Sequence, residues 1–520
     1  MIKEPTSKSL LFAILIGSIP ALIAYFSDEK AFQKYDFLIA STVLVAALLY
    51  SRRDRTLRFR FPAPLAVLIV SIPVFLHSFA PGPITNDEQA YLHQSKLFST
   101  GQLAEPLSDS DIAIVFQRRQ LYEDESRGLR FSKYPPGTSL AMIPAVWLDW
   151  PLLSTLICAL IDLWLLFLIA KEIGLKEKSH MAIGLLATSP FFLLLNTSWQ
   201  SEVFSLPLIL FSYYSYLRLP SNFRLWGLAL GSALGMAFLC RPLTAVVVAL
   251  IFGSVLLRQR KLSAVCFSIL GGVPFLTFSL AFNSWATGEP FTTTYEIYSQ
   301  KYTPFDVYGR GDFWTGFLRQ WGRWSIAFGG MLGAIGLALW GSWLIRKRDG
   351  GIIFLLLVLL PIAYSFHWYL GHRLYLGPLY LVELLPLLII ALLYLLARCP
   401  DNWRQGIPLA MMAFGGCFFT YRYGLILEES KIRAEPQLVA SSANLPSGAI
   451  VFLPSKKLGN KDHAFKHWTP SLPSDLVKNE PVFLRTTRNL TPQVLVKKLN
   501  LQGRPLYFYD DRDYSIIEIE

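Results

Sequence analysis

Two adjacent carboxylates, Asp87 and Glu88, follow a long apolar run and could carry acid–base chemistry. A carboxylate at a membrane surface can accept the proton of an attacking hydroxyl group, which is the task of a general base. The same residues also open the stretch "NDEQAYLHQSKLFSTG", whose spacing predicts an amphipathic helix that ends at Gly101. A role in starting this helix is therefore the alternative, and the residue types alone do not choose between the two.

Lys133 and Tyr134 stand in the stretch "FSKYPPGTSL", ahead of another apolar segment. Each proline restricts the residue before it to extended backbone, so the chain enters this segment in a fixed direction. Tyr134 is expected at the membrane interface, where aromatic residues concentrate, and Lys133 could pair with a lipid phosphate there. Substrate binding and a purely structural role are both open for these residues.

Glu202 and Arg241 are ionisable residues at the ends of apolar segments. An ionisable residue at membrane depth is a functional candidate by default, which makes Glu202 one. Arg241 follows "GLALGSALGMAFLC", where G-x-x-x-G spacing predicts close helix packing. Basic segments on both sides of residues 225–257 require two short crossings, so Arg241 falls at their outer turn and could bind an anion. A plain interfacial or turn position explains either residue as well.

Two outer loops supply the remaining candidates. The loop 283–302 contains Glu296, and the loop 367–386 contains Arg373 and Tyr375, all candidates for substrate binding. The two histidines of the second loop are five residues apart, a poor metal spacing on a helix, and the five cysteines form no Cys-x-x-Cys pattern. No metal site can be read, so any cofactor, a divalent metal ion included, stays unknown.

The elements that must position these residues are membrane helices. The chain has 520 residues, of which 53% are hydrophobic and only 16% are charged, where a soluble protein carries roughly 25% charged residues. Apolar runs that could cross a bilayer recur along the chain, and we expect about thirteen crossings. Nothing alternates as barrel strands do, so the crossings are helices. The predicted fold class is an all-α polytopic membrane protein with a small C-terminal α/β soluble domain.

Basic clusters give the expected orientation. "SRRDRTLRFR", "RQRK" and "RKRD" lie between apolar runs, as the positive-inside rule expects of cytoplasmic segments. The net charge of +12 is spread over such short clusters rather than along one stripe, which argues against nucleic acid as a partner. The N-terminus is then cytoplasmic, the loop 81–135 lies on the outer face, and the expected location is the plasma (inner) membrane.

Three regions are predicted. Residues 1–60 form an N-terminal helix pair, residues 61–425 form the main transmembrane module, and residues 426–520 form a small extracytoplasmic domain. In the last region "GAIVFLP", "PVFLR", "PLYFYD" and "YSIIEI" are short β-rich runs. "TPQVLVKKL" predicts a helix with Thr491 as its N-cap and Pro492 at its first position.

Five stretches in a fixed order resemble the GT-C membrane glycosyltransferases, particularly the protein O-mannosyltransferases and aminoarabinose transferases of glycosyltransferase family 39. They are "NDEQAYLHQSKLFSTGQL", "KYPPGTSL", "GLALGSALGMAFLCRPLTAV", "NSWATGEPFTTTYE" and "GHRLYLGPLYLVELLP". The resemblance implies transfer of a hexose or pentose from a polyprenyl-phosphate donor, with inversion, to an extracytoplasmic glycan, lipid or protein. It also implies that Asp87, with Glu88 beside it, is the general base and that Arg241 and Arg373 hold the donor phosphate.

One departure and two rival functions accompany this resemblance. The acidic loop of the family usually follows the first helix, whereas here it follows the third predicted one, as if residues 1–60 were an addition. A transporter or lipid-linked glycan flippase would place its polar groups near the bilayer midplane and often contain inverted repeats. This sequence places its charges in outer loops and shows no repeat. A non-catalytic member that only binds lipid-linked glycans would not need the acidic pair.

Overall fold

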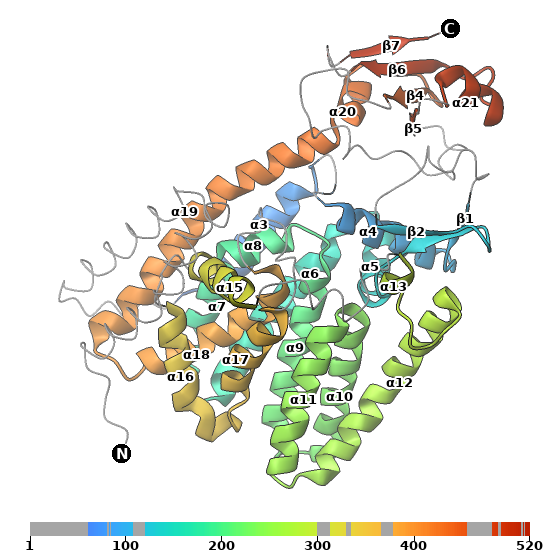
Figure 1. Cartoon of the computed structure of the whole chain (residues 1–520). Coiled ribbons are helices and arrows are strands. Elements are labelled where there is room, and N and C mark those ends of the chain that lie inside the picture. Colours follow the sequence, from blue (N-terminus) through green and yellow to red (C-terminus); the bar gives the residue numbers. More distant parts are fainter. Residues whose placement is uncertain are drawn as a thin grey trace. The chain divides into compact units, whose positions relative to one another are not determined.

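The computed structural model describes most of the chain after residue 60 (Figure 1). The described residues are 61–80, 83, 85–107, 120–298, 313–328, 334–365, 378–454, 481–486, 490–510, 513 and 515–519. The predicted N-terminal helix pair and the candidates Arg373 and Tyr375 lie outside them. The chain divides into two compact units, one of residues 1–76 and 135–423 and one of residues 77–134 and 424–520. This division differs from the three predicted regions, whose boundaries stay predictions.

The first unit is helical. Its helices are α3 (Ala63–His77), α5 (Gly137–Trp147), α6 (Leu152–Glu172), η2 (Lys176–Lys178), α7 (Ser179–Ala187), α8 (Pro190–Asn196), α9 (Ser201–Arg218), α10 (Phe223–Cys240), α11 (Pro242–Arg258), α12 (Leu262–Thr287), α13 (Thr294–Tyr298), α15 (Phe313–Ala327), α16 (Ala334–Asp349), α17 (Ile352–Ser365), η5 (Leu379–Leu384), α18 (Leu385–Leu396) and most of α19 (Asp401–Arg433). Among the described residues, four helices are long and apolar enough to cross a membrane, five if the bent pair 176–196 counts as one. The expected count of about thirteen crossings stays a prediction.

Local signals start several of these helices. The Asn222 side chain accepts a hydrogen bond from the Leu225 amide at 3.1 Å and so caps α10. Pro190 and Pro242 occupy the first positions of α8 and α11, where a missing amide hydrogen costs nothing. These caps fix where each apolar segment begins, and with it the positions of the polar residues at its ends.

Glycines let α10 and α12 pack backbone to backbone. A methyl group added at Gly231 would lie 1.7 Å from the Ser268 carbonyl oxygen, and one at Gly271 would lie 2.3 Å from that of Leu228. Such close approach is possible only without a side chain. The close packing predicted from the G-x-x-x-G spacing is confirmed, and it fixes the position of α10 relative to α12.

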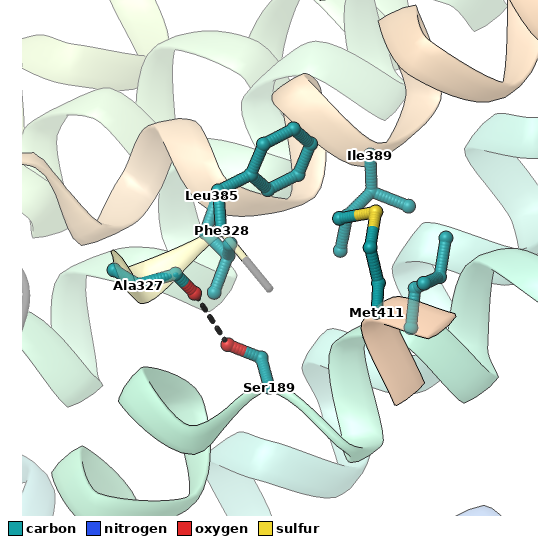
Figure 2. Close-up of a pocket in the computed structure, with 7 residues that line it drawn as sticks. Ser189, Ala327, Phe328, Leu385, Ile389 and Met411 are labelled. Carbon is teal, nitrogen blue, oxygen red and sulfur yellow. Dashed lines mark hydrogen bonds between the residues drawn. The ribbon is translucent and has the colours of Figure 1, made fainter. Parts of the chain in front are cut away.

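A small apolar cavity lies beside the bend between α7 and α8. The two helices meet at about Ser189 with a bend of 60°, and Ser189 Oγ donates to the Ala327 carbonyl at 3.3 Å. Figure 2 shows the cavity beside Phe328, Leu385 and Met411. Its volume is about 10 Å³, which is room for one water molecule and far too little for a sugar or a lipid.

The second unit contains a helix and a small sheet from the outer loop. Helix α4 (Asn86–Ser99) ends where Gly101 adopts a φ of +78°, so the predicted helix and its stop are confirmed. Three antiparallel strands follow in the order β1-β3-β2, with bounds Glu105–Pro106 for β1, Leu121–Asp124 for β2 and Leu129–Ser132 for β3. The sequence did not predict these strands, which are only two to four residues long.

Arg130 holds the three strands together. It is fully buried on the central strand β3, directly opposite Glu105 on one side and Glu123 on the other. Its guanidinium lies 3.3 Å from the carboxylate of Glu105 and 2.7 Å from that of Glu123. Cross-strand pairs of opposite charge stabilise a sheet that is too short to have a core of its own.

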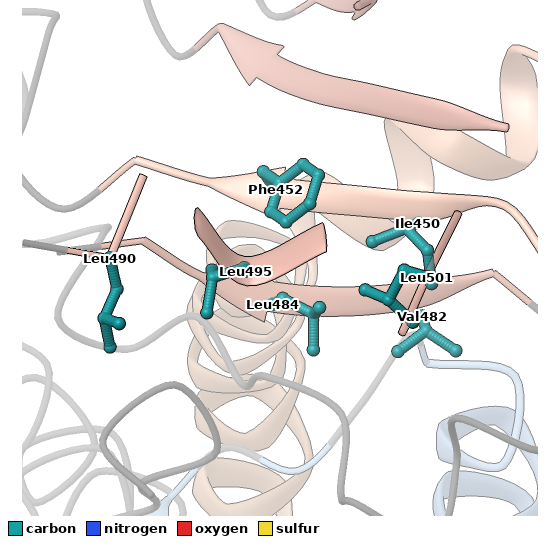
Figure 3. Packing of buried hydrophobic residues seen from close by; sticks show 7 residues of the cluster. All are labelled: Ile450, Phe452, Val482, Leu484, Leu490, Leu495 and Leu501. Atoms are coloured by element: carbon teal, nitrogen blue, oxygen red, sulfur yellow. The ribbon is translucent and has the colours of Figure 1, made fainter. Parts of the chain in front are cut away.

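The C-terminal part of this unit is a four-stranded sheet with the order β5-β4-β6-β7. The strands are β4 (Ile450–Leu453), β5 (Val482–Arg485), β6 (Leu506–Asp510) and β7 (Ser515–Glu518), accompanied by α20 (Glu435–Ser442) and α21 (Pro492–Lys498). Strand β4 is parallel to β5 and β6, and β7 is antiparallel to β6. Alternate residues of β4 and β5 pack with Leu495 of α21 (Figure 3).

Each predicted element of this C-terminal segment is found. The four β-rich runs contain the four strands, and Pro492 stands at the start of α21. Thr491 occupies the N-cap position with extended backbone, but its side chain makes no capping hydrogen bond. The predicted N-cap position of Thr491 is confirmed, and Pro492 at the first helical position is the local signal that starts this helix.

Candidate active site

Glu88, the second member of the acidic pair, is used to start helix α4. Its carboxylate accepts from the Thr85 amide at 3.0 Å and from the Thr85 hydroxyl at 2.9 Å, while the Glu88 amide donates back to Thr85 Oγ1 at 3.2 Å. This is a capping box, and Glu88 is only 1% exposed. The signature T-x-x-E is visible in the sequence and could have identified it.

Asp87 differs from Glu88 in both burial and hydrogen bonding. It lies half-buried in the first turn of α4, and its carboxylate makes no hydrogen bond with any described residue. Its electrostatic partner is Lys133, just beyond the end of strand β3. A carboxylate in the first helical turn is favoured by the helix dipole, which suits Asp87 to this position. Of the acidic pair, Asp87 is therefore the candidate for the predicted general base.

Lys133 is a buried cation beside Asp87. Its side chain is almost entirely enclosed, with 3% of the residue exposed, and its Nζ lies 5.1 Å from the centre of the Tyr134 ring. Burial lowers the pKa of Lys133 to about 8, while the negative charge of Asp87 acts in the opposite direction. Near neutral pH the ammonium group is still charged and is poorly hydrated, which favours binding of an anion.

Buried polar side chains hold α4 against strand β3. The Gln94 carbonyl oxygen accepts from the Ser132 amide at 2.8 Å, and the Gln94 amide donates to the Leu103 carbonyl at 2.8 Å. The Tyr91 and Tyr134 rings stack with centroids 4.5 Å apart. These contacts fix Lys133 relative to the first turn of α4. The sequence reading did not single out Gln94 or Tyr91, because partners this distant in the chain leave no local pattern.

A second group of charged residues lies in the helical unit, around Arg241. One guanidinium nitrogen, Nη1, lies 3.0 Å from Glu202 Oε1 and 3.5 Å from Glu383 Oε1. The other, Nη2, donates to the Tyr364 hydroxyl at 3.0 Å and to the Tyr380 carbonyl at 3.2 Å. We call these residues the Arg241 cluster: Glu202, Arg241, Tyr364, Glu383 and the backbone of Tyr380. All of them except Tyr380 are at most 6% exposed.

Aromatic rings and hydroxyl groups complete the Arg241 cluster. The Tyr364 and Tyr380 rings stack 5.5 Å apart, and the guanidinium carbon lies 5.6 and 5.2 Å from their centres. Ser205 Oγ donates to Glu383 Oε1 at 2.6 Å. Arg241 separates α10 from α11, as the sequence predicts for a turn residue, and Glu383 has the partner that an intramembrane glutamate requires. The contact between Arg241 and Glu383 could not be predicted from the sequence.

Of the remaining candidates, Glu296 is the one that the structure describes. Glu296 accepts a hydrogen bond from Thr293 Oγ1 at 3.1 Å at the start of the short helix α13. Within the described part of the chain, no three His, Cys, Asp or Glu side chains converge as a metal site would need. The residues in view therefore do not fit a bound divalent metal ion, and we assign no chemistry to one.

Comparison with known proteins gives consistent relatives. The family model for dolichyl-phosphate-mannose-protein mannosyltransferases matches residues 149–285. Two crystal structures of ArnT from Cupriavidus metallidurans, one bound to undecaprenyl phosphate and one in the apo state, are similar at 13% sequence identity. The similarity covers 86% of this chain and 93% and 92% of those chains, with TM-scores of 0.51 and 0.52. No curated protein matches the sequence.

Proposed function

On the premise that this chain is a membrane protein with the fold of the GT-C glycosyltransferases, we propose that it transfers a sugar from a polyprenyl-phosphate donor. The acceptor is a hydroxyl group on the extracytoplasmic face, and the transfer inverts the anomeric configuration. The observation that carries this proposal is the contrast within the acidic pair, in which Glu88 is used in a capping box and Asp87 is left available beside a buried lysine. A protein of this fold is known with undecaprenyl phosphate bound.

Asp87 acts as the general base in this proposal. Its carboxylate accepts the proton of the acceptor hydroxyl as the oxygen attacks the anomeric carbon. The bond between that carbon and the donor phosphate oxygen breaks, and polyprenyl phosphate leaves with the electron pair. Because attack and departure occur on opposite sides of the carbon in one displacement, the configuration inverts.

Lys133 stabilises the leaving phosphate. Negative charge grows on the phosphate as the glycosidic bond breaks, and a cation already stripped of water interacts with it strongly. Lys133 is such a cation, because it is only 3% exposed and its ammonium group lies beside the Tyr134 ring. Without substrate, the positive charge of Lys133 is attracted to the negative charge of Asp87, and this attraction favours keeping the two side chains close together.

Arg241 is proposed to hold Glu202 and Glu383 in position within the helical unit. Both terminal nitrogens of its guanidinium already have partners at 3.0–3.5 Å. Direct contact of Arg241 with the donor phosphate stays a prediction, because it would require one of these partners to be exchanged. The same holds for substrate contacts of Glu296, Arg373 and Tyr375.

The transfer can be tested with purified wild-type protein and synthetic polyprenyl-phosphate sugars labelled in the sugar. We expect release of polyprenyl phosphate and a glycoside product whose anomeric configuration, read by NMR, is opposite to that of the donor. In proteoliposomes, a flippase would instead move the intact donor between leaflets without cleaving it. A product with retained configuration would contradict the single displacement, and intact donor on both faces would contradict the enzyme.

A further inference from the structure

Asp162 lies near the middle of a membrane-crossing helix. It is the eleventh of the 21 residues of α6, so roughly 15 Å of helix separates it from either end. Helix α6 is one of the four described helices that are long and apolar enough to span a bilayer. The residue is completely buried. An aspartate in such a place is costly unless it is neutralised.

The described residues provide Asp162 with no partner of its own. Neither carboxyl oxygen has a hydrogen bond, and no ion pair includes it. Its electrostatic neighbours are Glu383, which carries the same charge, and the Cys158 thiol one turn earlier on α6. Arg241 is already shared between Glu202 and Glu383.

The charges of the described residues in this region do not balance. Glu202, Glu383 and Asp162 are three carboxyl groups, and Arg241 is the one cation among the described residues of the cluster. Two carboxylates in contact with the guanidinium already exceed its charge, so an ionised Asp162 would add a further buried, unpaired anion. Because Asp162 is fully enclosed, the cation that neutralises it has to be one that occupies almost no space. A proton meets that condition.

We propose that Asp162 is held as a neutral carboxylic acid, so that it forms a proton-binding site in the membrane interior beside the Arg241 cluster. It is a positioning residue: by carrying no charge it leaves Arg241 paired with Glu202 and Glu383 rather than drawn toward α6. A carboxyl group shares space with a like carboxylate only when one of the two is protonated. Between Asp162 and Glu383, the latter keeps its charge because Arg241 and Ser205 contact it.

Infrared spectroscopy of the full-length protein in lipid nanodiscs tests this directly. A protonated carboxyl group has a carbonyl stretching band that shifts in deuterium oxide, and carboxylates have none in that region. We expect Asp162→Asn to remove one such band. The matched control is Glu202→Gln, which changes a buried carboxylate of the same cluster and should leave the band in place. Retention of every protonated-carboxyl band in Asp162→Asn would overturn the proposal.

Thermal unfolding provides a second readout that uses no substrate and so does not depend on the proposed reaction. Asp162→Asn should unfold within a few degrees of wild type, because a neutral group without hydrogen bonds is replaced by another neutral group of similar size. Glu202→Gln should unfold at a clearly lower temperature, because it weakens a buried ion pair. If Asp162→Asn instead unfolds at a clearly higher temperature than wild type, the substitution has removed a buried, unpaired charge and the proposal is wrong; destabilisation as large as that of Glu202→Gln would show that the Asp162 carboxylate makes a stabilising charged contact and would also overturn it.

Discussion

The pairs Glu202–Arg241 and Asp87–Lys133 both join a carboxylate to a cation, yet they differ in how many other contacts the charged groups make. Around Arg241, ion pairs, hydrogen bonds and two aromatic rings occupy the guanidinium on all sides. Asp87 is half-buried and makes no hydrogen bond with the described residues, and its cation is a single lysine. The enclosed cluster has the construction of a structural centre, whereas the Asp87 carboxylate has no hydrogen bond of this kind and is the group that we propose to react.

Arg241→Met should give the largest effect and act on stability. Removing one partner of a buried charge cluster leaves Glu202 and Glu383 without their cation, which costs about 3–5 kcal/mol. Thermal unfolding in detergent measures it, with Arg258→Met, a change at an exposed arginine at the end of α11, as the control. If Arg241→Met unfolds at the same temperature as the control, the Arg241 cluster does not stabilise the fold.

Lys133→Met should show the reverse behaviour, with activity lost and stability kept. A hydrogen bond to a charged group is worth about 1.5–3 kcal/mol, so kcat/KM for the donor should fall roughly ten- to hundredfold. The unfolding temperature should stay the same or rise, because a buried ammonium group is costly. Lys96→Met changes an exposed lysine on α4 and serves as the control. Equal kcat/KM in the two variants would remove Lys133 from the reaction.

Activity and stability should respond to alkaline pH in opposite directions. Burial lowers the pKa of Lys133 from 10.5 to about 8. Transfer should therefore decline above about pH 8 as Lys133 loses its proton. Over the same range the unfolded chain still binds that proton, so the contribution of Lys133 to stability rises between pH 8 and pH 10.5. A pH–rate profile checks this, and Lys133→Arg should move the decline to higher pH. The same decline in Lys133→Arg would assign it to another group.

Glu88→Gln should have the smallest effect. Glutamine also closes a capping box, so helix α4 keeps its start and Asp87 keeps its place. We expect most of the transfer activity and an unfolding temperature close to that of wild type. Glu88→Ala, which cannot accept from Thr85, should lose about 1 kcal/mol of stability. Complete loss of transfer in Glu88→Gln with unchanged unfolding would instead make Glu88 catalytic.

Local signals in the sequence were sufficient for parts of the fold. Periodicity, glycine and proline predicted helix α4 and its stop at Gly101, the turn at Arg241 and the strands near the C-terminus. The fold that the resemblance implied agrees with the comparison, because two ArnT crystal structures are similar over 86% of this chain. Contacts between distant segments could not be predicted, because Arg241 and Glu383 meet only through the packing of several helices. A single sequence contains no record of such a contact.

The acidic pair illustrates the same limit at close range. Sequence alone left a capping role and a catalytic role open for Asp87 and Glu88 together. The capping box assigns the first role to Glu88, and Thr85 three residues before it was a visible signal. The buried partner of Asp87 was not visible, because Lys133 reaches it only through the pairing of α4 with strand β3.

The most direct test of the account is the rate of sugar transfer by Asp87→Asn at saturating donor, beside Glu88→Gln and wild type. Each rate is normalised to protein shown by thermal unfolding to be folded. We expect a loss of about two orders of magnitude or more in Asp87→Asn, with an unchanged unfolding temperature, and most activity retained in Glu88→Gln. A wild-type rate in Asp87→Asn would contradict it and remove Asp87 as the base.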